Sequence, residues 1–276
     1  MDFIAAFAWG WTGYGFMRMA LLAVLLIAPL YGLLGTMVVD GRMAFFADSL
    51  GHSSMTGVAL GVMLGLHTPL WAMVAFGVLY ALLLTWVKAR GGASTDTTIG
   101  VFSATGMALG IVLLSRSGGF AKYSGYLIGD LLAVGRGDVA AAAVVLVFVL
   151  VYWCVFYNPL LMTGVSGALA ASRGIRTRLM ETGFACLLAM VVMLSVRWVG
   201  VLIISAMLVL PSAAARNLAR NVRAYHLLAV LIALVCGVLG LLLSFAWGTA
   251  SGATIVLALA VCYGVTLVGK GNAGGT

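Results

Sequence analysis

Charged residues are scarce in this chain of 276 residues: only 8% are Asp, Glu, Lys or Arg, against roughly 25% in an ordinary soluble domain. Hydrophobic residues make up 64%, and the mean hydropathy is +1.18. So few charges cannot cover the surface of a soluble protein, which excludes that class. Because the apolar runs approach the roughly 20 residues that cross a bilayer as a helix, we predict an all-α integral membrane protein.

Cysteine is also rare, and the motifs of common enzymes are missing. The four cysteines all fall in apolar runs and show no CxxC spacing, so we expect them to be packing residues. There is no HExxH sequence. Residues 264–271 have the G-x4-G-K spacing of a phosphate loop but lack its Ser or Thr and a preceding strand. We therefore expect no ATPase site on this chain and no permanently bound cofactor.

Nine apolar segments predict the membrane spans. They cover residues 19–39, 43–66, 68–87, 98–115, 138–156, 179–196, 199–215, 225–245 and 252–269. Only Arg197 and Trp198 separate the sixth from the seventh, so eight spans are the alternative. Residues 124–134 are a candidate for a short helix that does not span.

The chain ends and the domain organisation can also be predicted. Residues 1–18 lack the basic start of a signal peptide, and we expect them to form an interfacial segment. No linker or low-complexity tract interrupts the chain, so residues 1–276 are expected to form a single transmembrane domain.

Basic residues indicate the orientation. Nine spans place the termini on opposite sides, and the side richer in Lys and Arg faces the cytoplasm. With the C-terminus inside, ten basic residues lie in inner segments: Arg42, Lys88, Arg90, Arg173, Arg176, Arg178, Arg216, Arg220, Arg223 and Lys270. Five remain outside: Arg18, Arg116, Lys122, Arg136 and Arg197. We therefore predict N-out and C-in. Anionic inner-leaflet lipid explains the net charge of +8, and no nucleic acid partner is needed.

An aspartate and a histidine four positions apart stand inside the second predicted span. Asp48 and His52 share one face of a helix, where a carboxylate oxygen and an imidazole nitrogen can bind one divalent cation. Two ligands make a weak site, which suits transit better than storage. The alternative is that the two side chains bond only to each other and orient the helix. Ionisable groups inside a membrane are costly and usually functional, which favours the transit role.

The same segment has a polar arc and a ridge of small residues. Ser49, Ser53 and Thr56 fall in one arc of roughly 140° with Asp48 and His52 at 100° per residue, and are candidates to line the pathway. The ridge is made of Gly57, Gly61 and Gly65. Its small-xxx-small spacing lets membrane helices approach closely, so we expect this helix to lie inside a bundle.

Residues 158–178 form a predicted inner loop in which small residues are followed by basic ones. Ser166 can cap a short helix over residues 167–173, and Gly174 suits the left-handed backbone after its last turn. Such a helix on the cytoplasmic face would serve as a docking element, and an ordinary connecting loop is the alternative.

Five stretches in a fixed order resemble the membrane permease of bacterial ABC importers for zinc, manganese or iron. They are GRMAFFADSLGHSSMTGVALG (41–61), DTTIGVFSATGMALGIVLLS (96–115), GYLIGDLLAV (125–134), VGVLIISAMLVLPSAAARNLAR (199–220) and SGATIVL (251–257). The resemblance implies a type II ABC importer-like permease in the bacterial cytoplasmic membrane. It also implies a second permease copy, two cytoplasmic ATPase subunits and an extracellular or periplasmic metal-binding protein.

Residue roles follow from the same resemblance. It makes Asp48 and His52 the transit site for the metal substrate. It makes the loop with Ser166, Ala170, Arg173 and Gly174 the contact with the ATPase. Departures from the family's pattern are Ser166, Gly167 and Ala168 in place of Asp-Pro-Glu, Arg173 in place of Leu, and Thr56 in place of a common proline.

Two other classes of protein remain as rivals. A proton-coupled secondary transporter or channel would need no ATPase, but Asp48 is the only carboxylate deep in a predicted span, which disfavours a proton relay. A non-transporting scaffold would leave the Asp48 and His52 pair unexplained.

Overall fold

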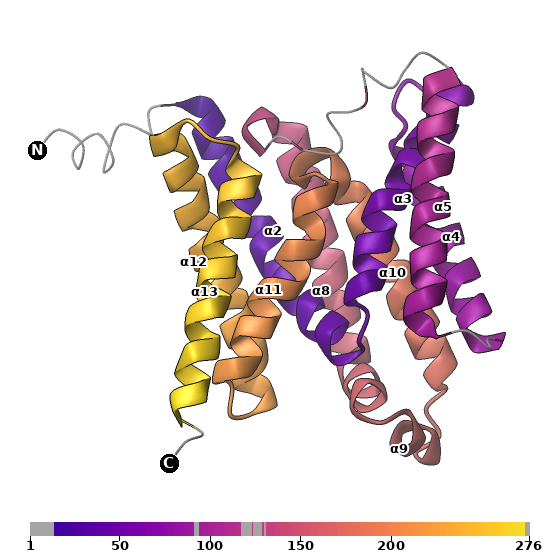
Figure 1. Ribbon diagram of the computed structural model, residues 1–276, viewed down its shortest axis with the longest axis vertical. Coiled ribbons are helices and arrows are strands. Elements are labelled where there is room, and N and C mark those ends of the chain that lie inside the picture. The colour runs from indigo at the N-terminus through magenta and orange to yellow at the C-terminus, as the bar shows by residue number, and fades with distance from the viewer. Residues whose placement is uncertain (1–13, 91–93, 117–122, 124–128, 130, 274–276) are drawn as a thin grey trace, which may run out of the picture. The chain divides into compact units, whose positions relative to one another are not determined.

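The computed structural model describes residues 14–90, 94–116, 123, 129 and 131–273, and these residues contain helices and no strand. The elements shown in Figure 1 are α2 (Gly15–Asp40), α3 (Ala44–Met63), α4 (Leu70–Arg90), α5 (Thr95–Arg116), the 3-10 turn η3 (Leu131–Ala133), α8 (Arg136–Val165), α9 (Gly167–Ser172), α10 (Thr177–Val199), α11 (Val201–Leu218), α12 (Val222–Trp247) and α13 (Ser251–Ala273). Most of the expected interfacial segment, residues 1–13, lies outside the described residues. So does much of the candidate short helix at 124–134, of which η3 is the described part.

The prediction of an all-α membrane protein is confirmed. Within the described residues, seven helices are long and apolar enough to cross a membrane: α2, α4, α5, α8, α10, α12 and α13. The polar residues of α3 keep it out of this group, and the apolar stretch Ile203–Leu218 of α11 is shorter. Each predicted span lies on its own helix, and the closely spaced sixth and seventh are separate helices divided at Gly200, whose φ is +85°. The number of spans and their orientation stay predictions.

Helix α8 is longer than the sequence predicted. The expected span ended at residue 156, but α8 continues through Pro159 to Val165, so the following loop is shorter than residues 158–178. A proline removes one backbone donor, which membrane helices tolerate where other groups compensate. The Thr163 hydroxyl donates to the Pro159 carbonyl at 2.8 Å in the turn that follows. At 1.5 Å per residue, the 30 residues of α8 are about 45 Å long, more than the roughly 30 Å hydrocarbon core.

The helices gather in two compact units, each built from separate stretches of the chain. The first unit contains Met1–Val39, Asp130–Leu150 and Ala206–Thr276. The second contains Asp40–Gly129 and Val151–Ser205. Neither unit is a continuous segment, so no point along the sequence separates them.

Glycines allow close helix contacts in the first unit. Helices α12 and α13 lie side by side (Figure 1), and a Cβ added at Gly240 would lie 2.5 Å from the Cα of Ile255. A Cβ at Gly32 of α2 would lie 2.8 Å from the Cα of Val230. A buried hydrogen bond also joins α2 to α12, since His226 Nδ1 of α12 lies 2.9 Å from the Thr36 hydroxyl of α2. Backbone contact of this kind maximises dispersion where lipid offers no hydrophobic driving force.

Helix α3 lies inside the second unit, where it contacts α4, α5 and α10. Cβ atoms at Gly57 and Gly61 would stand 2.7 Å from the Cα of Met73 and 2.8 Å from the Cα of Pro69, so these two glycines face α4 and the residue before it. Gly65 does not extend this ridge, because the helix ends at Met63 and Gly65 takes left-handed backbone with φ +69°. No atom lies within 4 Å of a Cβ built at Gly65.

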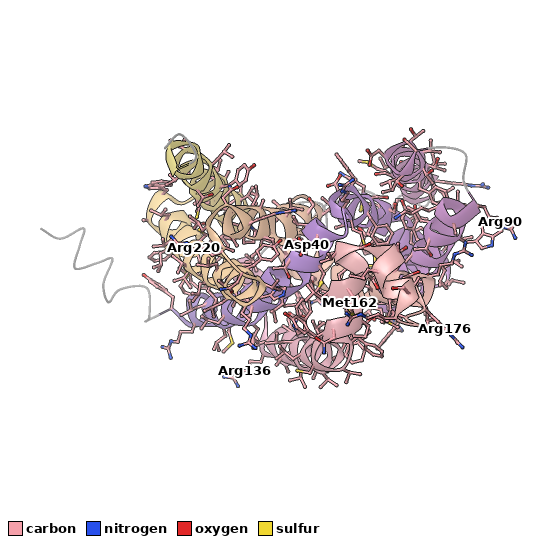
Figure 2. The ribbon with its side chains drawn as sticks, turned by 90° about the horizontal axis from the view of Figure 1, so that it is seen from below. Asp40, Arg90, Arg136, Met162, Arg176 and Arg220 are labelled. Carbon is pink, nitrogen blue, oxygen red and sulfur yellow. The ribbon has the colours of Figure 1, made fainter. Side chains whose placement is uncertain are left out.

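Basic side chains are exposed at one end of helices in the second unit. Arg90 is the last residue of α4 and Arg176 is the residue before α10, and Figure 2 shows both side chains in a view from below. Both are exposed. The α4 terminus also carries a cation–π contact, with the Arg90 guanidinium 4.0 Å from the centre of the Trp86 ring.

Candidate functional site

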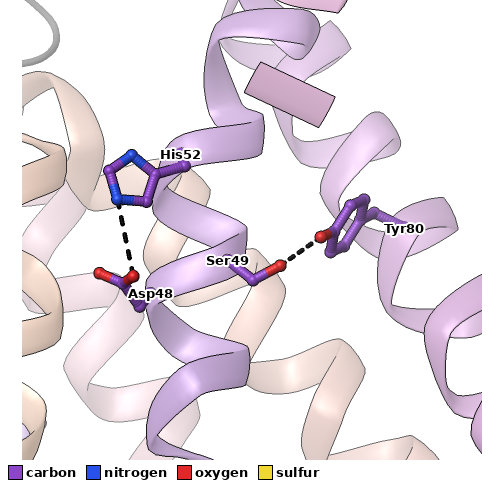
Figure 3. A network of polar contacts seen from close by, with 4 residues as sticks. All are labelled: Asp48, Ser49, His52 and Tyr80. Atoms are coloured by element: carbon purple, nitrogen blue, oxygen red, sulfur yellow. Dashed lines mark hydrogen bonds and ion pairs between the residues drawn. The ribbon is translucent and has the colours of Figure 1, made fainter. Parts of the chain in front are cut away.

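One continuous helix carries the predicted transit pair. A turn at Arg42, with φ +53°, precedes α3, which then runs unbroken from Ala44 to Met63. The family that the sequence resembles commonly has a proline at the position of Thr56, and a proline would remove one backbone hydrogen-bond donor. With Thr56 there, no proline interrupts the backbone hydrogen bonds of α3. Asp48 and His52 therefore lie one turn apart, with both side chains on the same side of α3 in Figure 3.

The distance between the two side chains suits a shared ion better than a hydrogen bond. His52 Nε2 lies 3.6 Å from Asp48 Oδ2, beyond the range of a good N–H···O bond. Zinc–oxygen and zinc–nitrogen bonds are roughly 2.0–2.2 Å, so one ion could contact both atoms with an angle of about 120° at the metal. The side chains are 44% and 26% exposed for Asp48 and His52, so an ion could reach them. The distance and exposure are compatible with two ligands to one ion.

The second imidazole nitrogen of His52 has no acceptor or donor in the described residues. Its Nδ1 is buried and without a hydrogen-bond partner there. Metal-bound histidines normally use their other nitrogen in a hydrogen bond that fixes the ring. Among the described residues, no group of three or more His, Cys, Asp or Glu could hold a metal ion. Asp48 and His52 could thus provide two ligands, and an ion bound there would need other groups to complete its coordination.

Ser49, Ser53 and Thr56 are buried in contacts between helices, and this structure does not show them lining a pathway with Asp48 and His52. The Ser49 hydroxyl is bonded to the Tyr80 hydroxyl of α4 (Figure 3). The Thr56 hydroxyl donates to the Gly106 carbonyl of α5. Ser53 faces the same turn of α5, since a Cβ at Gly106 would meet the Ser53 hydroxyl and Cβ. Polar groups in a low-dielectric bundle are stabilised by such bonds, which is why the arc turns toward α4 and α5.

The short helix predicted after Ser166 is present as α9. The Ser166 hydroxyl accepts a hydrogen bond from the Leu169 backbone at 3.3 Å, and Gly174 has φ +78° after the last turn. The Ile175 N–H closes the end by donating to the Ala170 carbonyl. Ala170 is buried and Arg173 and Gly174 are exposed. Both the cap and the terminating glycine are therefore where the sequence predicted them.

Three residues around α3 were not predicted from the sequence. Tyr80 contributes the hydroxyl that meets Ser49, and Gly106 and Gly110 of α5 allow the backbone of α3 to approach. The spacing of the two glycines is a small-xxx-small pattern and could have been recognised. Tyr80 stands in an apolar helix with no motif around it, and only the fold brings it to α3.

Comparison with known proteins decides the family. The family model described as ABC 3 transport family matches residues 13–270. The chain belongs to the ABC 3 transport family. The resemblance to permeases of metal-importing ABC transporters is thereby confirmed.

Individual relatives of this ABC 3 family member match over almost their full length. The high-affinity zinc uptake system membrane protein ZnuB of Haemophilus influenzae is 32% identical, with 90% of this chain and 95% of the relative covered. The manganese import system permease protein ScaB of Streptococcus parasanguinis is 30% identical, with 94% and 92% covered. A solved structure of PsaBC from Streptococcus pneumoniae in complex with Fab superposes with a TM-score of 0.84 at 28% identity, covering 95% of each chain. The chain therefore shares its fold with PsaBC over almost its full length.

Proposed function

We propose that this chain is the permease subunit of an ATP-driven importer that moves a divalent transition-metal ion across the bacterial cytoplasmic membrane. Zinc, manganese and iron(II) are the candidate substrates. Names of relatives support this class, since one is a zinc uptake protein and another a manganese import permease. Iron comes only from the resemblance of the sequence. A carboxylate and an imidazole accept all three ions, so the pair does not choose among them.

The proposal depends mainly on the geometry of Asp48 and His52. Their oxygen and nitrogen lie 3.6 Å apart, partly exposed, on a helix that is otherwise packed against its neighbours. Ions that bind two protein ligands bind weakly, which a translocation pathway needs because the ion must leave again. A second copy of the chain could supply two further ligands, and water could complete the rest. The importer is accordingly proposed to be a homodimer of permeases.

Two further partners belong to the proposed importer. ATP is hydrolysed by separate cytoplasmic subunits, which contact the loop containing Ser166, Ala170, Arg173 and Gly174. Exposed arginines beside α9, at positions 173, 176 and 178, support contact with an acidic or polar partner surface. An extracellular or periplasmic binding protein delivers the ion. In the predicted orientation, the end of α4 with Lys88 and Arg90 and the start of α10 with Arg176 and Arg178 face the cytoplasm, in line with the positive-inside rule.

Reconstitution tests the proposal. The permease is placed in liposomes with its candidate ATPase and binding protein, and uptake of Zn, Mn and Fe(II) is measured with and without ATP. We expect ATP-dependent uptake of at least one ion, and its loss in Asp48→Ala/His52→Ala. A matched control is Asp96→Ala/His67→Ala, which removes the same two residue types at exposed positions outside α3.

Each outcome separates the candidate functions. Uptake that persists in Asp48→Ala/His52→Ala, at equal amounts of protein, would contradict the assigned site. Flux that needs no ATP would favour a secondary transporter or channel. Equal losses in the control variant would mean that the assay reports damage to the protein in general.

A further inference from the structure

Tyr80 is tied to the residue that directly follows Asp48. Its hydroxyl is bonded to the Ser49 hydroxyl, which links α4 to α3 (Figure 3). Both residues are buried, with Tyr80 5% and Ser49 1% exposed. In a bundle of apolar side chains, a bond between two buried hydroxyls is favoured because no water is available to replace it.

The ring of Tyr80 is itself held in place. It meets the Phe102 ring of α5 edge-on, with centroids 5.7 Å apart and an interplanar angle of 79°. The Phe76 ring, one turn earlier on α4, lies 6.0 Å away. The edge-to-face pair of Tyr80 and Phe102 favours one orientation of the two rings. The hydroxyl of Tyr80 is therefore presented to α3 from a fixed position.

Ser49 and the pair of Asp48 and His52 lie on different sides of α3, and one rotation of the helix moves both sides. Successive residues of a helix are 100° apart, so turning α3 to break the bond at Ser49 would also move Asp48 and His52. The close contacts of Gly57 with Met73 and of Gly61 with Pro69 hold the later part of α3 against such a rotation. A second bond, from Thr56 to the Gly106 carbonyl of α5, fixes the later part of the helix, whereas Ser49 fixes the turn that carries the pair.

We infer that Tyr80 is a positioning residue for the transit site, acting through Ser49 to keep Asp48 and His52 in the geometry that passes the ion. The inference depends on the proposed function, because it assigns a role at the same site. It goes further by placing a determinant of transport on α4, outside the helix that carries the ligands. Tyr80 does not contact the ion itself.

The test uses the reconstituted importer with hydroxyl-deletion variants. Tyr80→Phe and Ser49→Ala each remove one partner and keep the remaining side chain, and the double variant removes both. Ser195→Ala is the matched control, because Ser195 is also 1% exposed in the second unit but its hydroxyl donates to the Val191 carbonyl of its own helix, not to another helix of the described residues. The maximal uptake rate, the concentration of loaded binding protein at half-maximal rate, and the thermal unfolding midpoint are measured for each.

We expect Tyr80→Phe and Ser49→Ala to lower the maximal uptake rate about 3-fold to 10-fold, the range that one hydrogen bond contributes. The half-maximal concentration should stay unchanged, since the buried side chains of Tyr80 and Ser49 are not available to a docked protein. The double variant should be no worse than either single variant, because both remove the same bond. The unfolding midpoints of Tyr80→Phe, Ser49→Ala and Ser195→Ala should all fall modestly, because each variant loses one hydrogen bond of a buried hydroxyl, but Ser195→Ala should keep the wild-type uptake rate.

Several results would overturn the inference. Wild-type rates in Tyr80→Phe would remove the role of the hydroxyl, and a double variant whose loss is the product of the two single losses would show independent effects. An equal loss in Ser195→Ala would show general sensitivity of the bundle. If the wild type imports metal but these variants behave normally, the positioning role alone fails. If the wild type imports none of the three ions with ATP, the proposed function fails and the positioning role with it.

Discussion

Gly110 of α5 lies against the backbone of Thr56 in α3, and a Cβ added at Gly110 would stand 2.6 Å from the Thr56 nitrogen. The neighbouring Met55 carbonyl carbon would be 2.7 Å away. One turn earlier on α5, the Gly106 carbonyl accepts a hydrogen bond from the Thr56 hydroxyl. The helix that carries Asp48 and His52 is thus in backbone contact with α5, and a side chain at Gly110 has nowhere to go without moving one of the helices.

Replacing Gly110 by alanine should therefore destabilise the protein. Overpacking a tight contact costs about 1–3 kcal/mol, and here the obstacle is backbone and not a flexible side chain. Gly100→Ala is the matched control on the same helix, since a Cβ there meets nothing within 4 Å. It should stabilise the helix by about 0.5–1 kcal/mol, because alanine loses less conformational freedom than glycine. The thermal unfolding midpoints of the purified variants in detergent should therefore be lower than wild type for Gly110→Ala and higher for Gly100→Ala.

Gly129 offers a second comparison, between two glycines with the same backbone conformation. Gly129 and Gly65 both have φ +69°, but a Cβ at Gly129 would lie 2.3 Å from the carbonyl carbon of Val199, whereas at Gly65 it meets nothing. Gly65→Ala should cost only the left-handed penalty of about 1–2 kcal/mol. Gly129→Ala adds a backbone clash, and we expect a loss above about 4 kcal/mol, seen as greatly reduced accumulation of folded protein. Equal unfolding midpoints for the two variants would contradict the close contact.

Local patterns in the sequence predicted the parts of this molecule that depend on neighbours along the chain. The helix start at Ser166, the end at Gly174 and the i,i+4 pair of Asp48 and His52 need only a few residues and the geometry of one helix. The predicted end of the fifth span, at residue 156, lies nine residues before the end of α8, because the helix continues through Pro159, which a long apolar helix tolerates.

Contacts between helices could not be predicted in the same way. The arc of Ser49, Ser53 and Thr56 was expected to face a pathway, but hydroxyls also stabilise contacts between helices, and periodicity does not distinguish the two. The partner of Ser49 is Tyr80, 31 positions away on another helix. Nothing near Tyr80 in the sequence indicates that its hydroxyl meets α3, because that contact depends on how the two helices rotate against each other.

The ends of α9 should affect coupling to ATP hydrolysis in the assembled importer. Ser166→Ala removes the cap, at about 0.5–2 kcal/mol, and Gly174→Ala strains a left-handed residue by about 1–2 kcal/mol. Either change should let α9 unwind and lower the stimulation of the ATPase by the permease. Gly167→Ala is the matched control, because Gly167 lies in the same helix without positive φ and a Cβ there meets nothing within 4 Å. Loss of stimulation in Gly167→Ala as well would assign the effect to contact with the ATPase and not to the helix ends.

Asp48→Asn should separate ion transfer from the rest of the transport cycle. The amide has almost the same size as the carboxylate but no negative charge, so the protein should fold normally while its metal ligand is lost. Changes in groups that only support a metal ligand already cost 10–100-fold in affinity or activity, so we expect at least a roughly 10-fold lower uptake rate. ATP hydrolysis by the assembled importer should continue, because α9 and its partner surface are untouched.

Slow uptake with normal ATP hydrolysis differs from the result expected for Ser166→Ala, where uptake and hydrolysis should fall together. Measuring uptake and hydrolysis on the same liposomes distinguishes the two, and a parallel loss of both activities in Asp48→Asn would count against a role confined to the ion.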